Sequence, residues 1–232
     1  MRFPFTLLFL LFTLLSCQNE PLPTASLDAF PVALDTVPEI PAPLPVPPPD
    51  YDTLQWTELD RLLPDIIIDL KYASDSNFVG EQMYACARAF LRPKAALALG
   101  KVQTELKQAG LNLKILDAYR PRPVQQRLWD KVPDRRYVTP PAKGSMHNRG
   151  AAVDLTLTDA TGNELDMGTP YDFFGKEAWY TYRNHPQNVL DNRKLLRETM
   201  ERHGFRGIRT EWWHFSFSGA GAVLSDWEWG CF

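Results

Sequence analysis

The sequence has little cysteine, few histidines and no marked excess of charge of either sign. Three Cys and four His stand among 232 residues, and 25 Lys and Arg face 28 Asp and Glu, for a net charge of −3. The basic residues are scattered and form no stripe, which argues against a nucleic-acid partner. The cysteines lack the spacing of a structural zinc site, and no internal repeat is present.

The first 17 residues, MRFPFTLLFLLFTLLSC, have the composition of an export signal. One Arg precedes an apolar run that ends at Cys17, and this run is shorter than the roughly 20 residues that a bilayer span needs. Its end, Leu-Leu-Ser-Cys, resembles a bacterial lipoprotein signal, in which Cys17 would be lipidated. We therefore expect a signal peptide over residues 1–16 and an exported protein tethered by lipid in the periplasm or at the cell surface. A plain signal peptide and an uncleaved anchor are the alternatives.

Prolines dominate the segment that follows, up to residue 50. Such a segment favours extended conformations and acts as a semi-rigid spacer, so we expect a tether over residues 17–50. A proline-rich ligand for a groove-binding domain is the alternative. Residues 51–232 are then enough for one domain with its own core. With Cys17 lipidated, Cys86 and Cys231 remain, and a disulfide or two buried thiols are both open.

Residues 51–232 show helix and strand patterns without a regular βαβ rhythm. Helical periodicity and boundary signals predict helices over 92–110, 123–132 and 191–205, the last with Asp191 as a possible N-cap. Alternating, β-branched or aromatic runs predict strands over 65–74, 111–120, 151–157 and 210–218. This mixture favours a single α+β domain with a mainly antiparallel sheet flanked by helices.

Two of the four histidines have a carboxylate close by in the sequence. His147 precedes Asp154 in SMHNRGAAVDLTL, and His214 follows Glu211 in EWWH. A catalytic zinc takes three nitrogen or oxygen ligands and keeps one open position, which His147, Asp154 and His214 would satisfy. Glu211 would then be free to act as a base. Because residues three apart on a strand face opposite sides, Glu211 and His214 can share a site only across a bulge or turn.

The order of several motifs resembles one peptidase family. Residues 145–154 match the SxHxxGxAxD pattern of zinc D-alanyl-D-alanine metallopeptidases, and residues 211–214 match their later ExxH element. The resemblance is strongest to VanX-type D-alanyl-D-alanine dipeptidases and covers the chain from residue 51 onward. The further matching stretches are DLKYASDSNFVG (69–80), DAYRP (117–121), DLTL (154–157), MGTPYDFF (167–174) and NRKLLRETMERHGF (192–205).

The resemblance implies a role for each matching residue. One zinc ion would be held by His147, Asp154 and His214. Glu211 would act as general base and then as the acid that protonates the leaving amine. Arg120 would stabilise the charge on the carbonyl oxygen. The residues that would bind or line the dipeptide are Ser145, Asp172, Tyr72 and Tyr137, with Asp172 taking the ammonium.

Asp117 has two possible explanations at this stage. The resemblance places it three residues before Arg120, where it could orient the guanidinium. A carboxylate at the end of a strand with no such role is equally compatible with the sequence.

The expected activity is hydrolysis of D-Ala-D-Ala to D-alanine. Export departs from the resistance-type dipeptidases, which act in the cytoplasm, so we expect a role in cell-wall turnover or D-alanine scavenging. The alternatives are a D,D-carboxypeptidase acting on stem peptides and a lipoprotein that binds wall peptides without cleaving them. Retention of Glu211 argues against binding alone, and the absence of a Gly-x-Ser-x-Gly elbow argues against a serine peptidase.

Overall fold

The computed structural model describes residues 47–221 and 223–231. The signal peptide, Cys17 and nearly all of the expected tether lie outside these residues. Within the described residues, no helix is both long and apolar enough to span a bilayer. Residues 47–232 form one compact unit.

A mixed sheet of five strands lies at the centre of this unit, in the order β2-β4-β5-β7-β6. Strand β2 pairs with β4 in parallel, and every other pairing in this sheet is antiparallel. The five strands are β2 (Ile67–Ile68), β4 (Leu111–Asp117), β5 (Ala152–Asp159), β6 (Phe205–Gly207) and β7 (His214–Phe217). A small separate ladder joins β1 (Thr57–Glu58) and β3 (Phe90–Leu91). The expectation of an α+β fold with a mainly antiparallel sheet is confirmed.

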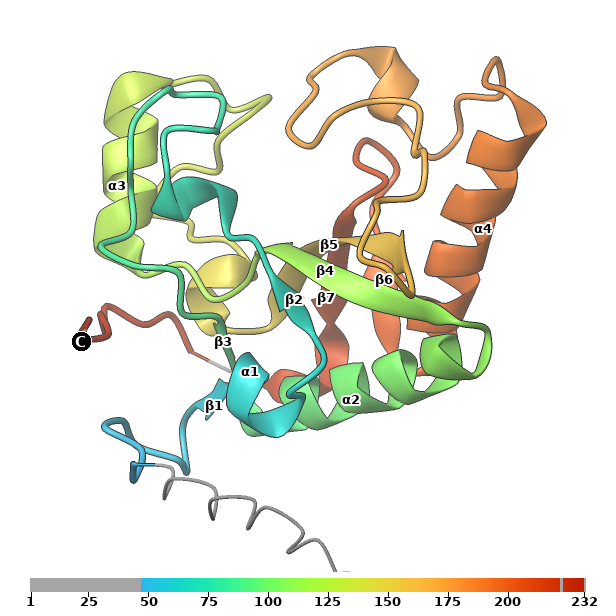
Figure 1. The fold of residues 1–232 in the computed structure, drawn as a ribbon. Coiled ribbons are helices and arrows are strands. Elements are labelled where there is room, and N and C mark those ends of the chain that lie inside the picture. The colour runs from blue at the N-terminus through green and yellow to red at the C-terminus, as the bar shows by residue number, and fades with distance from the viewer. Residues whose placement is uncertain (1–46, 222, 232) are drawn as a thin grey trace, which may run out of the picture. The chain divides into compact units, whose positions relative to one another are not determined.

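Helices flank the sheet, and two long ones, α2 and α4, contact each other as well as strands of the sheet (Figure 1). The α-helices are α1 (Leu59–Leu62), α2 (Pro93–Gln108), α3 (Arg122–Lys131) and α4 (Gln187–Arg202). The short 3-10 helices are η1 (Lys71–Ala73), η2 (His147–Arg149), η3 (Lys176–Ala178) and η4 (Ser218–Ala220). In α2, the side chains of Leu99, Val102 and Leu106 are buried at helical spacing. This periodic burial explains why the helix predicted from the sequence forms here.

Three expected boundaries were wrong. Only Ile67 and Ile68 of the predicted strand over 65–74 are in a ladder, and Tyr72 lies in η1 instead. Helix α4 begins one turn before Asp191, because Pro186 fixes an extended residue from which the helix starts at Gln187. Asp191 is therefore inside the helix and does not cap it.

The strand predicted over 210–218 is also shorter than expected, since β7 begins at His214. Residues before it form a bend, which places Glu211 outside the ladder. The turn that Glu211 and His214 needed in order to share a site is therefore present.

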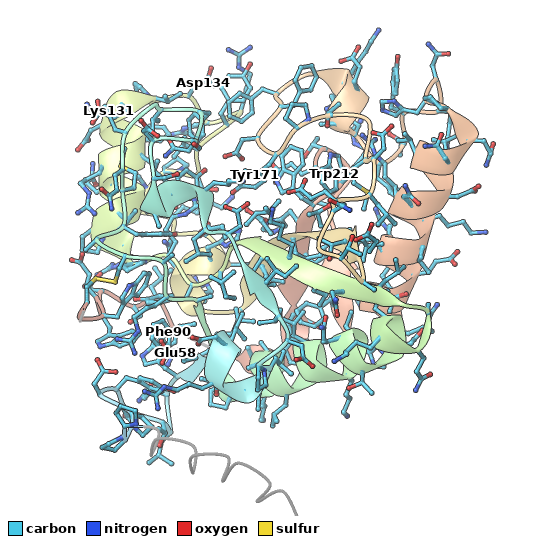
Figure 2. All side chains as sticks on the ribbon, viewed as in Figure 1. Glu58, Phe90, Lys131, Asp134, Tyr171 and Trp212 are labelled. Atoms are coloured by element: carbon cyan, nitrogen blue, oxygen red, sulfur yellow. A yellow bond between two sulfur atoms is a disulfide. The ribbon has the colours of Figure 1, made fainter. Side chains whose placement is uncertain are left out.

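The last described residues form a C-terminal strap, defined here as residues 223–231. Trp227 stacks on Trp56, with ring centroids 5.1 Å apart, and lies edge-on to Phe90 at 5.0 Å. Cys231 forms a disulfide with Cys86, with Cα atoms 6.0 Å apart, seen as the yellow bond in Figure 2. Of the two states left open for these cysteines, the structure has the disulfide.

Candidate metal centre

Three side chains from η2, β5 and β7 converge on one point. Asp154 and His214 are paired across the β5–β7 ladder. Their Oδ1 and Nδ1 atoms are 2.9 Å apart, and the Nε2 of His147 lies 3.3 Å from that Oδ1 and 3.1 Å from that Nδ1. These three residues can hold a metal ion.

A tight turn brings His147 to the start of the strand that carries Asp154. The helical turn η2 ends at Gly150, which has φ +65° and lies so close to Trp56 that a Cβ there would clash with the indole ring. The backbone then enters β5 directly. Glycine is required here because both the left-handed conformation and the close approach exclude a side chain.

Hydrogen bonds to the far nitrogens orient both imidazole rings. The Nδ1 of His147 lies 2.7 Å from the backbone carbonyl of Ala118, which can only accept, so this nitrogen carries the proton and Nε2 is free as a ligand. The Nε2 of His214 lies 3.0 Å from the Oγ of Ser216, which leaves Nδ1 facing Asp154. The carbonyl of Ala118 selects the tautomer of His147, and the contact with Ser216 holds the His214 ring with Nδ1 toward the cluster.

A hydrogen bond to Oδ2 holds the Asp154 carboxylate in place. The hydroxyl of Tyr171 donates to Oδ2 at 3.0 Å, and Oδ1 remains beside the two histidines. Tyr171 belongs to the segment that leads from β5 to α4, and Figure 2 shows it above the central sheet. The tyrosine therefore leaves one carboxylate oxygen for the ligand position.

The electrostatics of this cluster favour a bound cation. Burial alone raises the pKa of Asp154, but the neighbouring His147 and His214 outweigh it and hold the pKa well below its usual range. Asp154 is therefore a buried anion, only 3% exposed. Two neutral imidazole nitrogens and one carboxylate oxygen are a donor set that fits zinc.

Glu211 lies beside the ligands without joining them. Its Oε2 is 4.0 Å from the Nδ1 of His214. Burial raises the pKa of its carboxyl group above the usual value. A carboxylate with a raised pKa next to a metal position is suited to accept and return a proton.

Arg120 is held rigidly at the edge of the same pocket. Its Nη2 and Nε donate to Oδ2 of Asp117 at 2.5 and 3.1 Å, and its Nη1 donates to Gln125 at 3.0 Å. Asp117 is completely buried and also accepts a bond from the Tyr84 hydroxyl at 2.6 Å. Of the two explanations for Asp117, this geometry favours orientation of Arg120.

A pocket of about 420 Å³ opens over the cluster. It is within the range of about 300–1,000 Å³ that is typical of small-molecule sites. Its lining includes every site residue expected from the sequence except Asp117, which lies buried behind Arg120, and Cys17, which is outside the described residues. The expected residues on its wall are Tyr72, Arg120, Tyr137, Ser145, His147, Asp154, Asp172, Glu211 and His214.

Comparison with known proteins places this chain in a family. Residues 52–228 match the family model described as D-ala-D-ala dipeptidase, of the M15 peptidases. The chain belongs to this family. It is 40% identical over 183 residues to the D-alanyl-D-alanine dipeptidase of Escherichia coli K12, covering 78% of this chain and 94% of that one. It is 30% identical over 178 residues to the D-alanyl-D-alanine dipeptidase of Enterococcus faecalis V583, covering 68% and 88%.

A looser likeness is found among solved structures. VanYB in complex with D-alanine-D-alanine is similar at a TM-score of 0.39 and 17% identity, over 57% of this chain and 74% of that one.

In this member of the dipeptidase family, Asp172 lies in the pocket wall and is not one of the three residues that can hold the metal. Its Oδ2 accepts a hydrogen bond of 2.8 Å from the Tyr72 hydroxyl. Its φ of +57° is the one positive value at a non-glycine residue within the described parts of the chain. Burial, together with the charge of Asp154, raises the pKa of Asp172 well above its usual value. The backbone thus holds a carboxyl group in an uncommon conformation that faces the pocket.

Ser145 and Tyr137 have partners of their own within the pocket wall. The Ser145 hydroxyl donates to Oδ1 of Asn148 at 3.1 Å, and the Asn148 amide donates to the backbone carbonyl of Arg120 at 2.7 Å. The Tyr137 ring packs on Phe174, with centroids 4.1 Å apart. Asn148 thus joins the loop that carries His147 to the segment that carries Arg120.

Sequence reasoning missed the residues that orient the expected ones. Tyr171 and Asn148 lie inside motifs that resemble the dipeptidase family, and their positions in those motifs could have drawn attention to them. Ser216 lies two residues after His214 on the same strand, so strand periodicity places the two on one face. For Tyr84 and Gln125, we find no signal in the sequence, because their contacts to Asp117 and Arg120 depend on tertiary packing.

Proposed function

We propose that this protein is a zinc dipeptidase that hydrolyses D-Ala-D-Ala to two molecules of D-alanine. The observation that carries the proposal is the convergence of His147, Asp154 and His214 beside Glu211 in a small pocket. The names of the relatives from Escherichia coli and Enterococcus faecalis support the choice of substrate.

One zinc ion per chain would be held by His147, Asp154 and His214. When bound, zinc makes water a stronger acid and polarises a carbonyl group. Glu211 accepts the proton of the attacking water and delivers it to the leaving amine, a task that its raised pKa suits. Arg120, braced by Asp117, presents a fixed positive charge to the oxygen of the scissile carbonyl.

The pocket wall recognises the ends of the dipeptide. Asp172 binds the substrate ammonium as a carboxylate, since the ion pair with the ammonium replaces the proton that burial of Asp172 favours. Tyr72 holds Asp172 in place through its hydroxyl. Ser145 and Tyr137 line the same pocket and complete the binding surface.

We further propose that the enzyme works outside the cytoplasm. Residues 1–16 would be a lipoprotein signal peptide, Cys17 the lipidated residue, residues 17–50 a tether and residues 51–232 the catalytic domain. The Cys86–Cys231 disulfide supports this location, because disulfides persist in oxidising compartments. Dipeptide released from peptidoglycan would be the substrate there, which suits cell-wall turnover or D-alanine scavenging.

The deciding experiment compares free D-Ala-D-Ala with N-acetyl-D-Ala-D-Ala as substrates of the zinc-loaded full chain. A dipeptidase cleaves the free dipeptide and loses that activity in Glu211→Gln. Preference for the acetylated peptide would transfer the assignment to a carboxypeptidase. Binding of zinc and of dipeptide with no turnover would instead support a wall-peptide-binding protein.

A further inference from the structure

Four aromatic side chains form a continuous row in the wall of the pocket. We call this row, Tyr72, Phe78, Phe174 and Tyr137, the aromatic arch. All four residues line the pocket that contains the metal cluster. Tyr72 is buried at the base of the arch, whereas Phe174 and Tyr137 are 41% and 37% exposed. The arch therefore runs from the interior to the mouth of the pocket.

Each ring in the arch contacts the next. The centroids of Tyr72 and Phe78 are 6.2 Å apart in an edge-on arrangement, and those of Phe78 and Phe174 are 5.1 Å apart, also edge-on. Phe174 then lies against Tyr137 with centroids 4.1 Å apart and planes 32° apart. Distances and angles of this kind are those of attractive aromatic pairs.

The arch joins segments that are far apart in the sequence. Tyr72 and Phe78 belong to η1 and the loop after it, Tyr137 follows α3, and Phe174 lies in the long segment before α4. Figure 1 shows the segment after α3 and the segment before α4 extending above the sheet from opposite sides. The contact between Phe174 and Tyr137 connects these two sides across the pocket mouth.

The arch adjoins the carboxyl group that is proposed to bind the substrate ammonium. Asp172 bonds to Tyr72 at one end of the arch and lies two residues from Phe174 in the chain. The left-handed φ of Asp172 fixes the direction in which the chain continues to Phe174. The amino end of a dipeptide bound at Asp172 would therefore meet aromatic rings of the same pocket wall.

We propose that the aromatic arch limits substrate length at the amino end, and that Phe174 is the residue that sets the limit. This proposal rests on the proposed function, because it assigns the ammonium to Asp172. A group attached to the amine would have to displace the Phe174 ring from its contacts with Phe78 and Tyr137. The arch is thus a steric filter separate from the charge of Asp172.

The chain contains a matched control for Phe174. Phe173 is the neighbouring residue, has the same side chain and is 40% exposed, against 41% for Phe174. Its ring lies over Gly175, where an added Cβ would clash with it, and it is not among the residues lining the pocket. Phe173→Ala therefore removes as much exposed apolar surface without changing the arch.

The experiment uses D-Ala-D-Ala carrying N-formyl, N-acetyl or N-butyryl groups with the zinc-loaded full chain. All three lack the ammonium, so they lose the contact with Asp172 equally and differ only in size. In the wild type and in Phe173→Ala, we expect kcat/KM to fall about tenfold or more from formyl to butyryl, as a closed pocket rejects added carbons. In Phe174→Ala, this dependence on size should disappear.

A size dependence in Phe174→Ala equal to that of the wild type would overturn the proposal, as would its loss in Phe173→Ala. Phe174→Leu, which keeps an apolar side chain, provides a second test if the alanine variant is not folded. Turnover of free D-Ala-D-Ala is measured in parallel, and its absence in the wild type contradicts the proposed function alone. The arch is then tested by calorimetric binding of the same three peptides, and equal affinities in wild type and Phe174→Ala, or no binding to either, would exclude it.

Discussion

His214 and Ser216 lie two residues apart on β7, and the Nε2 of the histidine is 3.0 Å from the Oγ of the serine. Strand geometry puts both side chains on one face, so the serine is placed to accept the Nε2 proton. This leaves the Nδ1 of His214 directed at Asp154. A single hydroxyl thus helps to hold the His214 ring with Nδ1 toward the metal position.

Removal of this hydroxyl should weaken metal binding. We expect Ser216→Ala to reduce zinc affinity by about 10- to 100-fold, the usual effect of losing a group that orients a ligand. Competition with a chromophoric chelator measures the dissociation constant. Ser216→Thr, which retains the hydroxyl, should bind zinc like the wild type. Equal affinity in the alanine variant would show that the ring is oriented by other contacts.

Replacement of Arg120 should impair catalysis more than folding. Arg120→Lys keeps a positive charge near Asp117 but cannot donate to both Asp117 and Gln125 in the same planar arrangement. We expect kcat/KM for D-Ala-D-Ala to fall by about 100- to 1,000-fold, as when one oxyanion donor is removed. Circular dichroism checks that the variant is folded. A fall of only a few fold would remove Arg120 from the proposed mechanism.

The charge of Asp172 should appear in KM. Asn accepts the left-handed conformation of this position as well as Asp does, so Asp172→Asn keeps the backbone and loses only the charge. We expect KM for D-Ala-D-Ala to rise by about 10- to 100-fold, the value of a hydrogen bond to a charged group. Zinc affinity serves as the control and should not change. An unaltered KM would place the ammonium elsewhere in the pocket.

Asp159 should make stability depend on pH in the acid range. Its carboxylate, at the end of β5, accepts bonds from the backbone N–H groups of Thr161 and Asn163 and from their side chains, which lower its pKa to about 2. A depressed pKa contributes stability above the ordinary value of 3.8, and this contribution is lost as pH falls toward 2. Between pH 5 and pH 2, urea unfolding should show a steeper loss for the wild type than for Asp159→Asn. Parallel pH profiles would contradict this assignment.

The disulfide should contribute strongly to stability. It joins residues 145 positions apart, so its removal increases the entropy of the unfolded chain. We expect Cys86→Ser with Cys231→Ser to lower the free energy of unfolding by ~2–5 kcal/mol. Reductant should lower the denaturation midpoint of the wild type to a similar extent and leave the double variant unaffected. Equal midpoints for the wild type with and without reductant would show that the disulfide does not contribute.

The chemistry of the site could be predicted from the sequence because it is concentrated in short motifs. His147 and Asp154 are separated by one turn with a glycine at its end, and Glu211 and His214 by a bend, so local chain geometry nearly determines each pair. What local geometry cannot give is the meeting of the two pairs. That depends on the β5–β7 register, which pairs Asp154 with His214.

The misplaced end of the first predicted strand and the omission of Tyr84 share a physical cause, since both concern contacts made far along the chain. The predicted strand over 65–74 ends at Ile68, and Tyr72 lies in η1 instead. In that position the Tyr72 hydroxyl bonds to Asp172, which is 100 residues away in the sequence. The Cys86–Cys231 pairing likewise required the strap to cross the domain. The start of α4 has a different explanation. Pro186 in the sequence could have indicated a helix beginning at Gln187, but the N-cap expected from the sequence was Asp191 instead.

The C-terminal strap affects the order in which the site is completed during synthesis. The backbone N–H of Ser225 donates to the carbonyl of Asn148 at 2.9 Å, and the N–H of Arg122 donates to the carbonyl of Ser225 at 3.1 Å. One late residue therefore supports both the loop of His147 and the segment after Arg120. A nascent chain whose catalytic residues have all been synthesised still lacks this support, because Ser225 follows His214 in the sequence. We therefore expect the site to be completed only after Ser225 has been synthesised, and we expect C-terminal truncations or fusions that displace Ser225 to weaken the supports of His147 and Arg120.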